Sequence, residues 1–304
     1  MVQGVAFHDG RYMPAEEAKI SILDPAFTRS DVVYDTATVW KGHFFRLDDH
    51  IARFFRSCEG MRLKPPHNAA EIKSILAECV DRAGLEDAYV QFVCTRGPFV
   101  DLANRDPRNC KNGFYAYAIP YIWIISKEKQ DRGARIAIGS NRRIPDSAIN
   151  QRIKNFNWMD LSRGVIEAFD RGYDHVVLLT PDGRVAEGPG FNVWIIKDGT
   201  LKTPKDNCLH GLTRRTVFDF ARELNIPAVE VDLREEDLYN ADEVFLSTEG
   251  GGLMPVGQVE DKIYGNGGPG MMTSQLRAEY WRRREAGWMG TKVTSLIARE
   301  PVVA

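Results

Sequence analysis

The sequence predicts two α+β domains with mixed or antiparallel sheets, and three observations lead to this fold class. The chain of 304 residues is long enough for one large or two medium domains with sizeable cores. Its second half alternates strand and helix patterns. Within that half, Val176–Glu187 has the pattern of a hairpin that turns at Pro181–Asp182–Gly183, which does not suit a doubly wound parallel sheet.

The charged stretch Ser126–Arg132 marks the domain boundary, because such polar segments commonly separate folded units. We therefore expect a small N-terminal α+β domain over residues 1–125, an interdomain linker over 126–132 and a large C-terminal α+β domain over 133–288. Residues 289–304 are expected to form a weakly ordered C-terminal tail.

In the first half, short strands and turns are expected as far as residue 45, followed by two helices and two longer strands. A helix over 47–61 has its apolar residues on one side and ends before Pro65–Pro66, and a second helix over 69–83 stops at Gly84. Residues 88–95 and 114–125 are rich in aromatic and β-branched residues, which favours strands. The polar loop between them is long enough to suggest a functional or mobile segment.

In the second half, strands and helices follow from the same patterns. Strands are expected at residues 134–138, 175–179, 191–196, 228–231 and 243–246. Helices are expected shortly after Lys154, over 213–224 and over 269–284.

Composition excludes several classes of function. Forty Lys and Arg residues against 42 Asp and Glu give a net charge of −2, which argues against nucleic acid or an anionic membrane as a partner. No apolar run approaches the roughly 18 residues of a membrane span, and the N-terminus does not resemble a signal peptide, so we expect a cytoplasmic protein. The five cysteines form no CxxC pair and the histidines no HExxH pattern, so nothing indicates a metal.

Lys154 is the first candidate for chemistry, because it lies among amides and aromatic residues at Asn155–Trp158 and just before an amphipathic helix. Burial against an apolar wall lowers the pKa of a lysine, which an amine needs in order to act as a nucleophile. The alternative is an ordinary basic residue at the start of a helix.

Three further stretches could complete a site with this lysine. Glu187 ends a short strand before Gly188–Pro189–Gly190, where it could bond a protonated pyridine nitrogen or be a solvated acid in a turn. His210–Arg214 precedes a helix whose N-terminal N–H groups favour phosphate, although Thr213 could equally be a simple cap. Ser247–Gly252 suits a phosphate or a tight loop, and Glu249 would repel a phosphate unless its side chain turns away.

Together these pieces resemble the fold type IV pyridoxal-phosphate enzymes, which include branched-chain aminotransferases, D-amino-acid aminotransferases, aminodeoxychorismate lyases and (R)-selective amine transaminases. The resemblance extends over roughly residues 3–285. It rests on FRLDDHIARF (45–54), FVCTRG (92–97), IKNFNW (153–158), AEGPGFNVWIIKDGTL (186–201), GLTR (211–214) and ADEVFLST (241–248). The run over residues 30–51, together with Tyr115 and Tyr117, most resembles the (R)-selective amine transaminases.

The resemblance implies a role for each matching residue. Lys154 would form a Schiff base with pyridoxal 5'-phosphate and move the proton during transfer, and Glu187 would keep the pyridine nitrogen protonated. The other expected cofactor-binding positions, most of them around the phosphate, are Arg53, Trp158, Leu212, Thr213, Thr248 and Glu249. The substrate side would be formed by Tyr34, Tyr89 and Gln91, with Arg29 and Arg105 as further candidates. In this family the site lies between the two domains and near the interface of a homodimer.

The chain departs from the family at several of these positions. Glu249 replaces a hydroxyl residue that usually follows the threonine at 248, and Gln91 stands where amine transaminases often have a glutamate. Met159 occupies the position of a tyrosine in branched-chain enzymes, which counts against that activity. Leu102 replaces an arginine that pairs with a keto-acid carboxylate in some relatives, which leaves Arg105 as the nearest candidate.

The resulting hypothesis is a transaminase, and the closest subgroup implies (R)-selectivity. It would move an amino group from a primary amine or D-amino acid to a keto acid or ketone. A D-amino-acid or branched-chain aminotransferase and an aminodeoxychorismate-type lyase remain alternatives that use the same cofactor. A cofactor-binding protein without catalysis, or a domain with a merely structural lysine, would need no substrate at all.

Overall fold

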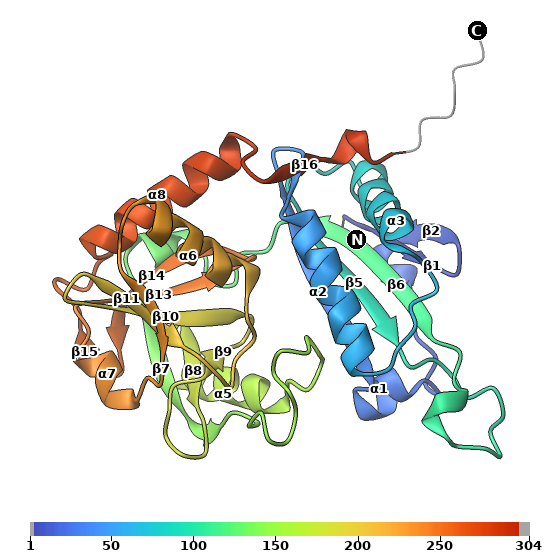
Figure 1. The fold of residues 1–304 in the computed structure, drawn as a ribbon, viewed down its shortest axis with the longest axis horizontal. Helices are drawn as coiled ribbons and strands as arrows, with labels where there is room; N and C mark the ends of the chain where they lie inside the picture. Colours follow the sequence, from blue (N-terminus) through green and yellow to red (C-terminus); the bar gives the residue numbers. More distant parts are fainter. Residues whose placement is uncertain (1–2, 298–304) are drawn as a thin grey trace, which may run out of the picture. The chain divides into compact units, whose positions relative to one another are not determined.

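The structure, a computed structural model, describes residues 3–297 and divides them into two units (Figure 1). The first unit contains the chain up to Ile122, the segment Ile153–Phe156 and the chain from Arg284 onward. The second contains Trp123–Arg152 and Asn157–Arg283. Neither unit is therefore one continuous stretch of sequence.

The first unit is an antiparallel sheet of seven strands in the order β16-β4-β3-β5-β6-β1-β2. Its strands are β1 (Val5–His8), β2 (Arg11–Pro14), β3 (Val32–Trp40), β4 (His43–Phe45), β5 (Ala88–Thr95), β6 (Gly113–Pro120) and β16 (Gly290–Lys292). Its helices are α1 (Pro25–Arg29), α2 (Leu47–Gly60) and α3 (Ala69–Arg82), with short 3-10 turns η1 (Ala15–Glu17), η2 (Pro107–Asn109) and η3 (Val293–Ser295).

Helices α2 and α3 cover one face of this sheet (Figure 1). Ile51, Phe54 and Cys58 recur at helical spacing on α2 and enter the core, as the sequence pattern predicts. Alternate residues of β3, β5 and β6 reach the same core, so their neighbours lie on the opposite face of the sheet. That second face carries the candidate substrate residues.

The second unit is a mixed sheet of nine strands in the order β12-β11-β10-β13-β14-β7-β8, with β15 beside β14 and β9 beside β10. Its strands are β7 (Ala134–Arg142), β8 (His175–Leu179), β9 (Glu187–Gly188), β10 (Phe191–Lys197), β11 (Thr200–Pro204), β12 (Ala228–Val231), β13 (Glu243–Thr248), β14 (Gly252–Val259) and β15 (Lys262–Ile263). Helices α4 (Lys127–Asp131), α5 (Met159–Asp170), α6 (Leu212–Glu223), α7 (Glu235–Tyr239) and α8 (Met271–Glu285) complete the secondary structure.

The predicted fold class is confirmed, because one sheet is antiparallel and the other is mixed, and both carry helices. The predicted hairpin is also present. The chain reverses after β8 at a turn with Gly183 at φ 81°, and Leu179 then pairs antiparallel with Val185. This reversal places Glu187 at the start of β9.

The predicted interdomain linker over 126–132 is wrong. These residues form α4 in the second unit, because the Ser126 hydroxyl accepts the Lys129 N–H and the buried Gln130 donates to the carbonyl of Ile125. Charged residues on a short exposed helix produce the same sequence signal as a linker.

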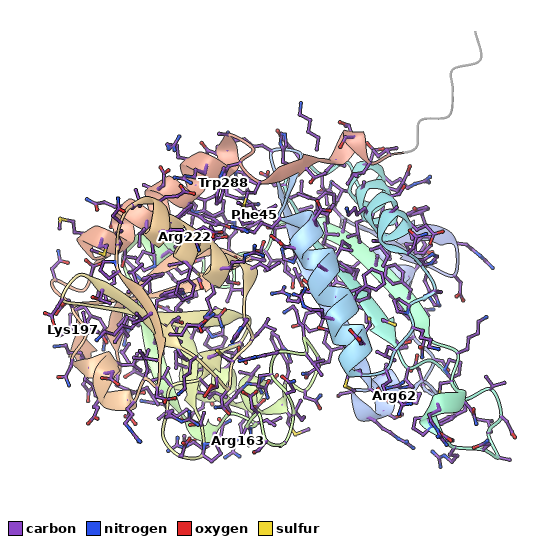
Figure 2. The ribbon with its side chains drawn as sticks, in the orientation of Figure 1. Phe45, Arg62, Arg163, Lys197, Arg222 and Trp288 are labelled. Atoms are coloured by element: carbon purple, nitrogen blue, oxygen red, sulfur yellow. The ribbon has the colours of Figure 1, made fainter. Side chains whose placement is uncertain are left out.

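The predicted boundary at 288 and the tail over 289–304 also differ from the structure. The first unit takes up the chain from Arg284, and Gly290–Lys292 forms β16 beside β4. Just before that strand, the ring of Trp288 lies 6.0 Å from that of Phe45, and both are labelled in Figure 2. The last part of the predicted tail, residues 298–304, lies outside the described residues.

Residues 3–297 lack two features that would indicate a membrane protein or a metal protein. No helix in this range has the length and apolar character required to cross a membrane. The same range contains no group of three or more His, Cys, Asp or Glu side chains that could hold a metal ion.

Candidate active site

Lys154 lies in a short extended segment that is bound along β3 of the first unit. The carbonyl of Lys154 accepts the N–H of Tyr34 at 3.0 Å, and its own N–H donates to the hydroxyl of Ser57 on α2 at 3.2 Å. The next residue, Asn155, pairs with Val33 in an isolated bridge. The lysine is thus fixed by its backbone rather than by a helix, since α5 begins only at Met159.

The side chain of Lys154 lies against an aromatic surface. Its Nζ is 4.2 Å from the centroid of the buried Tyr34 ring, which in turn is 4.5 Å from the ring of Phe156. An ammonium group over an aromatic face gains a favourable electrostatic contact. The side chain of Lys154 thus has an aromatic neighbour, but Lys154 is only half-buried, and its role as a nucleophile stays a prediction.

Arg53 on α2 is bound by a buried carboxylate. Its Nε and Nη2 donate to the two oxygens of Asp35, each at 2.8 Å, and Nδ1 of His50 lies 2.8 Å from the same carboxylate. Burial alone would raise the pKa of Asp35, but the guanidinium of Arg53 and the bonds from Arg53 and His50 lower it well below its usual range. Asp35 therefore carries a charge that orients the arginine.

We expect Asp35→Asn to lower the free energy of unfolding by about 3–5 kcal/mol, because it leaves the Arg53 cation buried beside a neutral amide. Urea unfolding at pH 7 measures this loss. Glu78→Gln is the control, since Arg82 also donates to a carboxylate at 2.9 Å there, but the Arg82 side chain is 53% exposed. The control should lose about 1 kcal/mol or less, and equal losses would contradict the role assigned to burial.

The candidate substrate residues lie on the face of the first unit's sheet away from α2 and α3. Tyr89 and Gln91 alternate along β5 with core residues, and the Tyr89 hydroxyl is 3.5 Å from Oε1 of Gln91. Gln91 also lines a pocket of about 420 Å³, together with Phe27, Tyr117 and Phe156. Because Phe156 contacts Tyr34, this pocket continues the aromatic surface on which Lys154 lies.

The two candidate arginines of the substrate side are both exposed. Arg29 is the last residue of α1. Arg105 belongs to the loop between β5 and β6, where its guanidinium lies 6.0 Å from the centroid of the Phe99 ring. Neither position alone assigns a role in binding a carboxylate.

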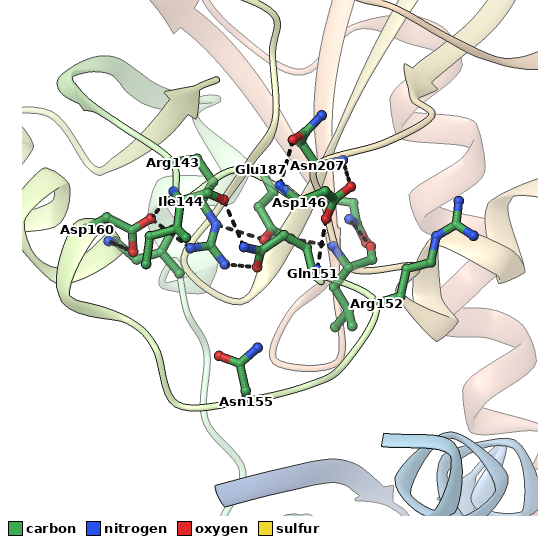
Figure 3. Close-up of polar contacts among 12 residues, drawn as sticks. Arg143, Ile144, Asp146, Gln151, Arg152, Asn155, Asp160, Glu187 and Asn207 are labelled. Carbon is green, nitrogen blue, oxygen red and sulfur yellow. Dashed lines mark hydrogen bonds and ion pairs between the residues drawn. The ribbon is translucent and has the colours of Figure 1, made fainter. Parts of the chain in front are cut away.

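Glu187 is the centre of a buried network in the second unit, drawn in Figure 3. Its Oε1 accepts from Nε of Arg143 at 3.1 Å, and its Oε2 accepts the N–H of Leu209 at 2.9 Å. Arg143 also donates to Asp160 at 2.7 Å and to Gln151. The two carboxylates raise the pKa of Arg143, although burial acts in the opposite direction.

Arg143 is a site residue that the sequence analysis missed. It follows β7 immediately, 44 positions before Glu187, and no local pattern distinguishes it from Arg142. The ion pair with Glu187 arises only when the turn after β8 brings the two residues together. The sequence alone therefore carries no signal that Arg143 is buried beside Glu187.

The candidate phosphate positions meet at the N-terminus of α6. Gly211 precedes this helix and offers no side-chain cap to its N–H groups, and a β-carbon there would lie 2.3 Å from Oδ1 of Asn192. The Thr213 hydroxyl donates to the carboxylate of Glu249 at 2.7 Å. Uncapped N–H groups at the start of a helix are suited to an anion.

Thr248 and Trp158 adjoin the glycine turn after Glu187. The Thr248 hydroxyl donates to the carbonyl of Gly190 at 2.6 Å and accepts the N–H of Gly250 at 3.2 Å. A β-carbon on Gly190 would lie 3.7 Å from the Trp158 ring, so the indole is close to this turn. Hydroxyls, N–H groups, a buried carboxylate and an indole match the chemistry of a phosphorylated pyridine ring.

The predicted residues are therefore brought together in two groups, one in each unit. The first unit holds Arg53, Tyr34, Tyr89, Gln91 and Lys154 on or beside β3, β5 and α2. The second group surrounds β9, the α6 N-terminus and the end of β13, and it comprises Trp158, Glu187, Leu212, Thr213, Thr248 and Glu249.

Comparison with known proteins identifies the family. Residues 32–259 match the model of the amino-transferase class IV family. A putative branched-chain-amino-acid aminotransferase of Methanocaldococcus jannaschii is 31% identical over 90% of this chain and 93% of its own length. A D-alanine aminotransferase of Bacillus licheniformis is 27% identical over 88% of this chain and 93% of its own length.

A solved structure leads to the same family. The branched-chain amino acid aminotransferase of Thermobaculum terrenum in its PLP-form superposes with a TM-score of 0.82 at 26% identity, covering 96% of this chain and 98% of that one. The chain belongs to the class IV aminotransferases. The predictions of fold type IV, of an aminotransferase and of pyridoxal phosphate as its cofactor are confirmed.

Proposed function

We propose that this aminotransferase moves an amino group from a primary amine or D-amino acid to a keto acid or ketone, and that it is selective for (R)-amines. The observation that carries the preference for an apolar amine is the pocket of about 420 Å³ beside the aromatic surface under Lys154, and the (R)-selectivity rests on the resemblance to that subgroup. Its volume suits a small ligand. Among the described residues that line it, Lys19 is the one cation and most are apolar, which favours a bulky apolar amine over an amino acid.

The proposed residues divide the chemical work. Pyridoxal phosphate, when bound, supplies an aldehyde that takes up the amine and a ring that withdraws electrons. The amine of Lys154 would hold the cofactor and would move the proton between the two carbons that exchange it. Tyr34 and Phe156 shield this amine from water, and Tyr89 and Gln91 orient the substrate.

The cofactor itself would be held at its two ends. Glu187 would hold the proton on the ring nitrogen, since Arg143 and the N–H of Leu209 fix the orientation of its buried carboxylate. The N–H groups of Leu212 and Thr213, the hydroxyl of Thr248 and the guanidinium of Arg53 are suited to the phosphate.

A second candidate is a branched-chain or D-amino-acid aminotransferase, which the names of the relatives favour. Met159 opposes the branched-chain activity, since this position carries a tyrosine near the cofactor in branched-chain enzymes, whereas here the side chain is 86% exposed. A lyase would use the same cofactor without returning an amino group.

The proposal extends to a homodimer in the cytoplasm. Ile22, Leu23 and Phe27 are each more than half exposed on one segment of the first unit, and exposed apolar clusters commonly mark protein interfaces. Sedimentation equilibrium should give about twice the chain mass of 34.4 kDa, and a monomer at micromolar concentration would overturn this part.

The substrate proposal is tested by the visible spectrum of the cofactor-loaded protein. Bleaching of the yellow band by (R)-1-phenylethylamine, and not by its (S)-enantiomer, is the expected result. Bleaching by D-alanine alone would replace the proposal with a D-amino-acid aminotransferase, and bleaching by L-leucine alone with a branched-chain enzyme. Turnover that continues without any keto-acid acceptor would indicate a lyase.

A further inference from the structure

The N-terminus of α6 already has an anion beside it. The carboxylate of Glu249 accepts the hydroxyl of Thr213, which is the second residue of α6. Thr213 is buried and Glu249 is half-buried, so the bond is not an exposed surface contact. Negative charge at a helix N-terminus is stabilised by the same N–H groups and dipole that favour a phosphate.

The position of Glu249 follows from the end of β13. The Thr248 hydroxyl donates to the carbonyl of Gly190 and accepts the N–H of Gly250, so the backbone on both sides of Glu249 is fixed. The glutamate side chain therefore leaves a constrained turn and reaches the hydroxyl of Thr213, the residue whose N–H the proposed function gives to the phosphate. A carboxylate and a phosphate cannot both accept that hydroxyl's single proton.

We infer that Glu249 is an internal competitor of the cofactor phosphate, which must displace the carboxylate from the Thr213 hydroxyl in order to bind. The inference rests on the proposed phosphate site at α6. Its consequence is a loosely held and exchangeable cofactor, since two like charges near one helix end repel each other. Because the phosphate gains this hydroxyl only by displacing Glu249, the hydroxyl adds little net cofactor affinity in the wild type.

Glu249→Gln tests the inference through the dissociation constant of pyridoxal phosphate, measured by the absorbance of the bound cofactor. We expect the variant to bind about tenfold more tightly, because one repulsive charge is gone, and tenfold corresponds to about 1.4 kcal/mol. Binding of pyridoxal, which lacks the phosphate, should not change. Glu236→Gln, an exposed position on α7 of the same unit, controls for net charge and should change neither constant.

A double-mutant cycle with Thr213→Val separates competition from simple charge repulsion. In the wild type, this substitution should change the dissociation constant less than twofold. In the Glu249→Thr background, where the hydroxyl is released, it should weaken binding about fivefold. Equal effects in both backgrounds would overturn the inference.

The outcomes also separate this inference from the proposed function. A wild type that binds no pyridoxal phosphate would reject the phosphate site itself. A wild type that binds it with the same constant as both Glu249→Gln and Glu249→Thr would reject only the competition. The apo proteins should unfold at similar temperatures, and a variant that melts early is replaced by Glu249→Ala in the same titration.

Discussion

Lys154→Ala is expected to abolish amino transfer while the protein stays folded. The substitution removes the amine that we propose to bind the cofactor and carry the proton, and we expect turnover to fall by at least about 10⁴-fold, the upper end of what a positioned acid–base group contributes. The fold should survive, because the bonds from this position to Tyr34 and Ser57 are made by its backbone. Steady-state transamination and far-UV circular dichroism measure the two effects.

Arg152→Ala is the matched control for Lys154→Ala. Arg152 is an exposed cation two positions earlier in the same connection, so its loss changes the net charge equally without removing the candidate nucleophile. The control should keep its turnover within about twofold. Full turnover by Lys154→Ala would reject the mechanism.

Glu187→Gln is expected to lower turnover by about 10²–10³-fold, similar to the loss of one preorganised electrostatic group in other active sites. An amide has the shape of the carboxylate but cannot stabilise a positive charge on the ring nitrogen. The substitution also removes one anion beside the buried Arg143, so the free energy of unfolding should fall by about 1–3 kcal/mol.

Asp160→Asn separates these two effects of Glu187→Gln. Asp160 is the other carboxylate bound to Arg143, at 2.7 Å, so this variant shares the electrostatic loss around the arginine. Its free energy of unfolding should fall about as much as that of Glu187→Gln. Its turnover should fall less than about tenfold below that of the wild type. A loss of turnover as large as that of Glu187→Gln would mean that Glu187 acts only through Arg143.

Features that depend on adjacent residues were predictable from the sequence. The glycine turn after Glu187 and the helix that follows Gly211 are set by local conformation, so their patterns indicated both the elements and their candidate roles. The hairpin after β8 was predictable for the same reason. The mixed or antiparallel sheets were predicted from the alternation of strand and helix patterns and from this hairpin.

Buried ion pairs were not predictable in the same way. Asp35 lies in a run of β-branched residues, and its partners Arg53 and His50 lie on a separate helix. Nothing local distinguishes these charges from solvated ones, because their pairing depends on how α2 packs on β3. The stretch 126–132 was assigned to a linker for a related reason. A charged helix and a charged linker have the same composition, so the local sequence does not distinguish them.

The order of strands in the first unit has a consequence for synthesis on the ribosome. Its sheet uses β1 to β6 early, but β16 joins the free edge of β4 only after residue 290 has emerged. Until then β4 is an open edge, which is prone to pairing with other chains. Lys154 likewise reaches β3 only after β7 of the other unit has been made. A fragment that ends near residue 125 would therefore lack β16, which covers the edge of β4, and would also lack Lys154.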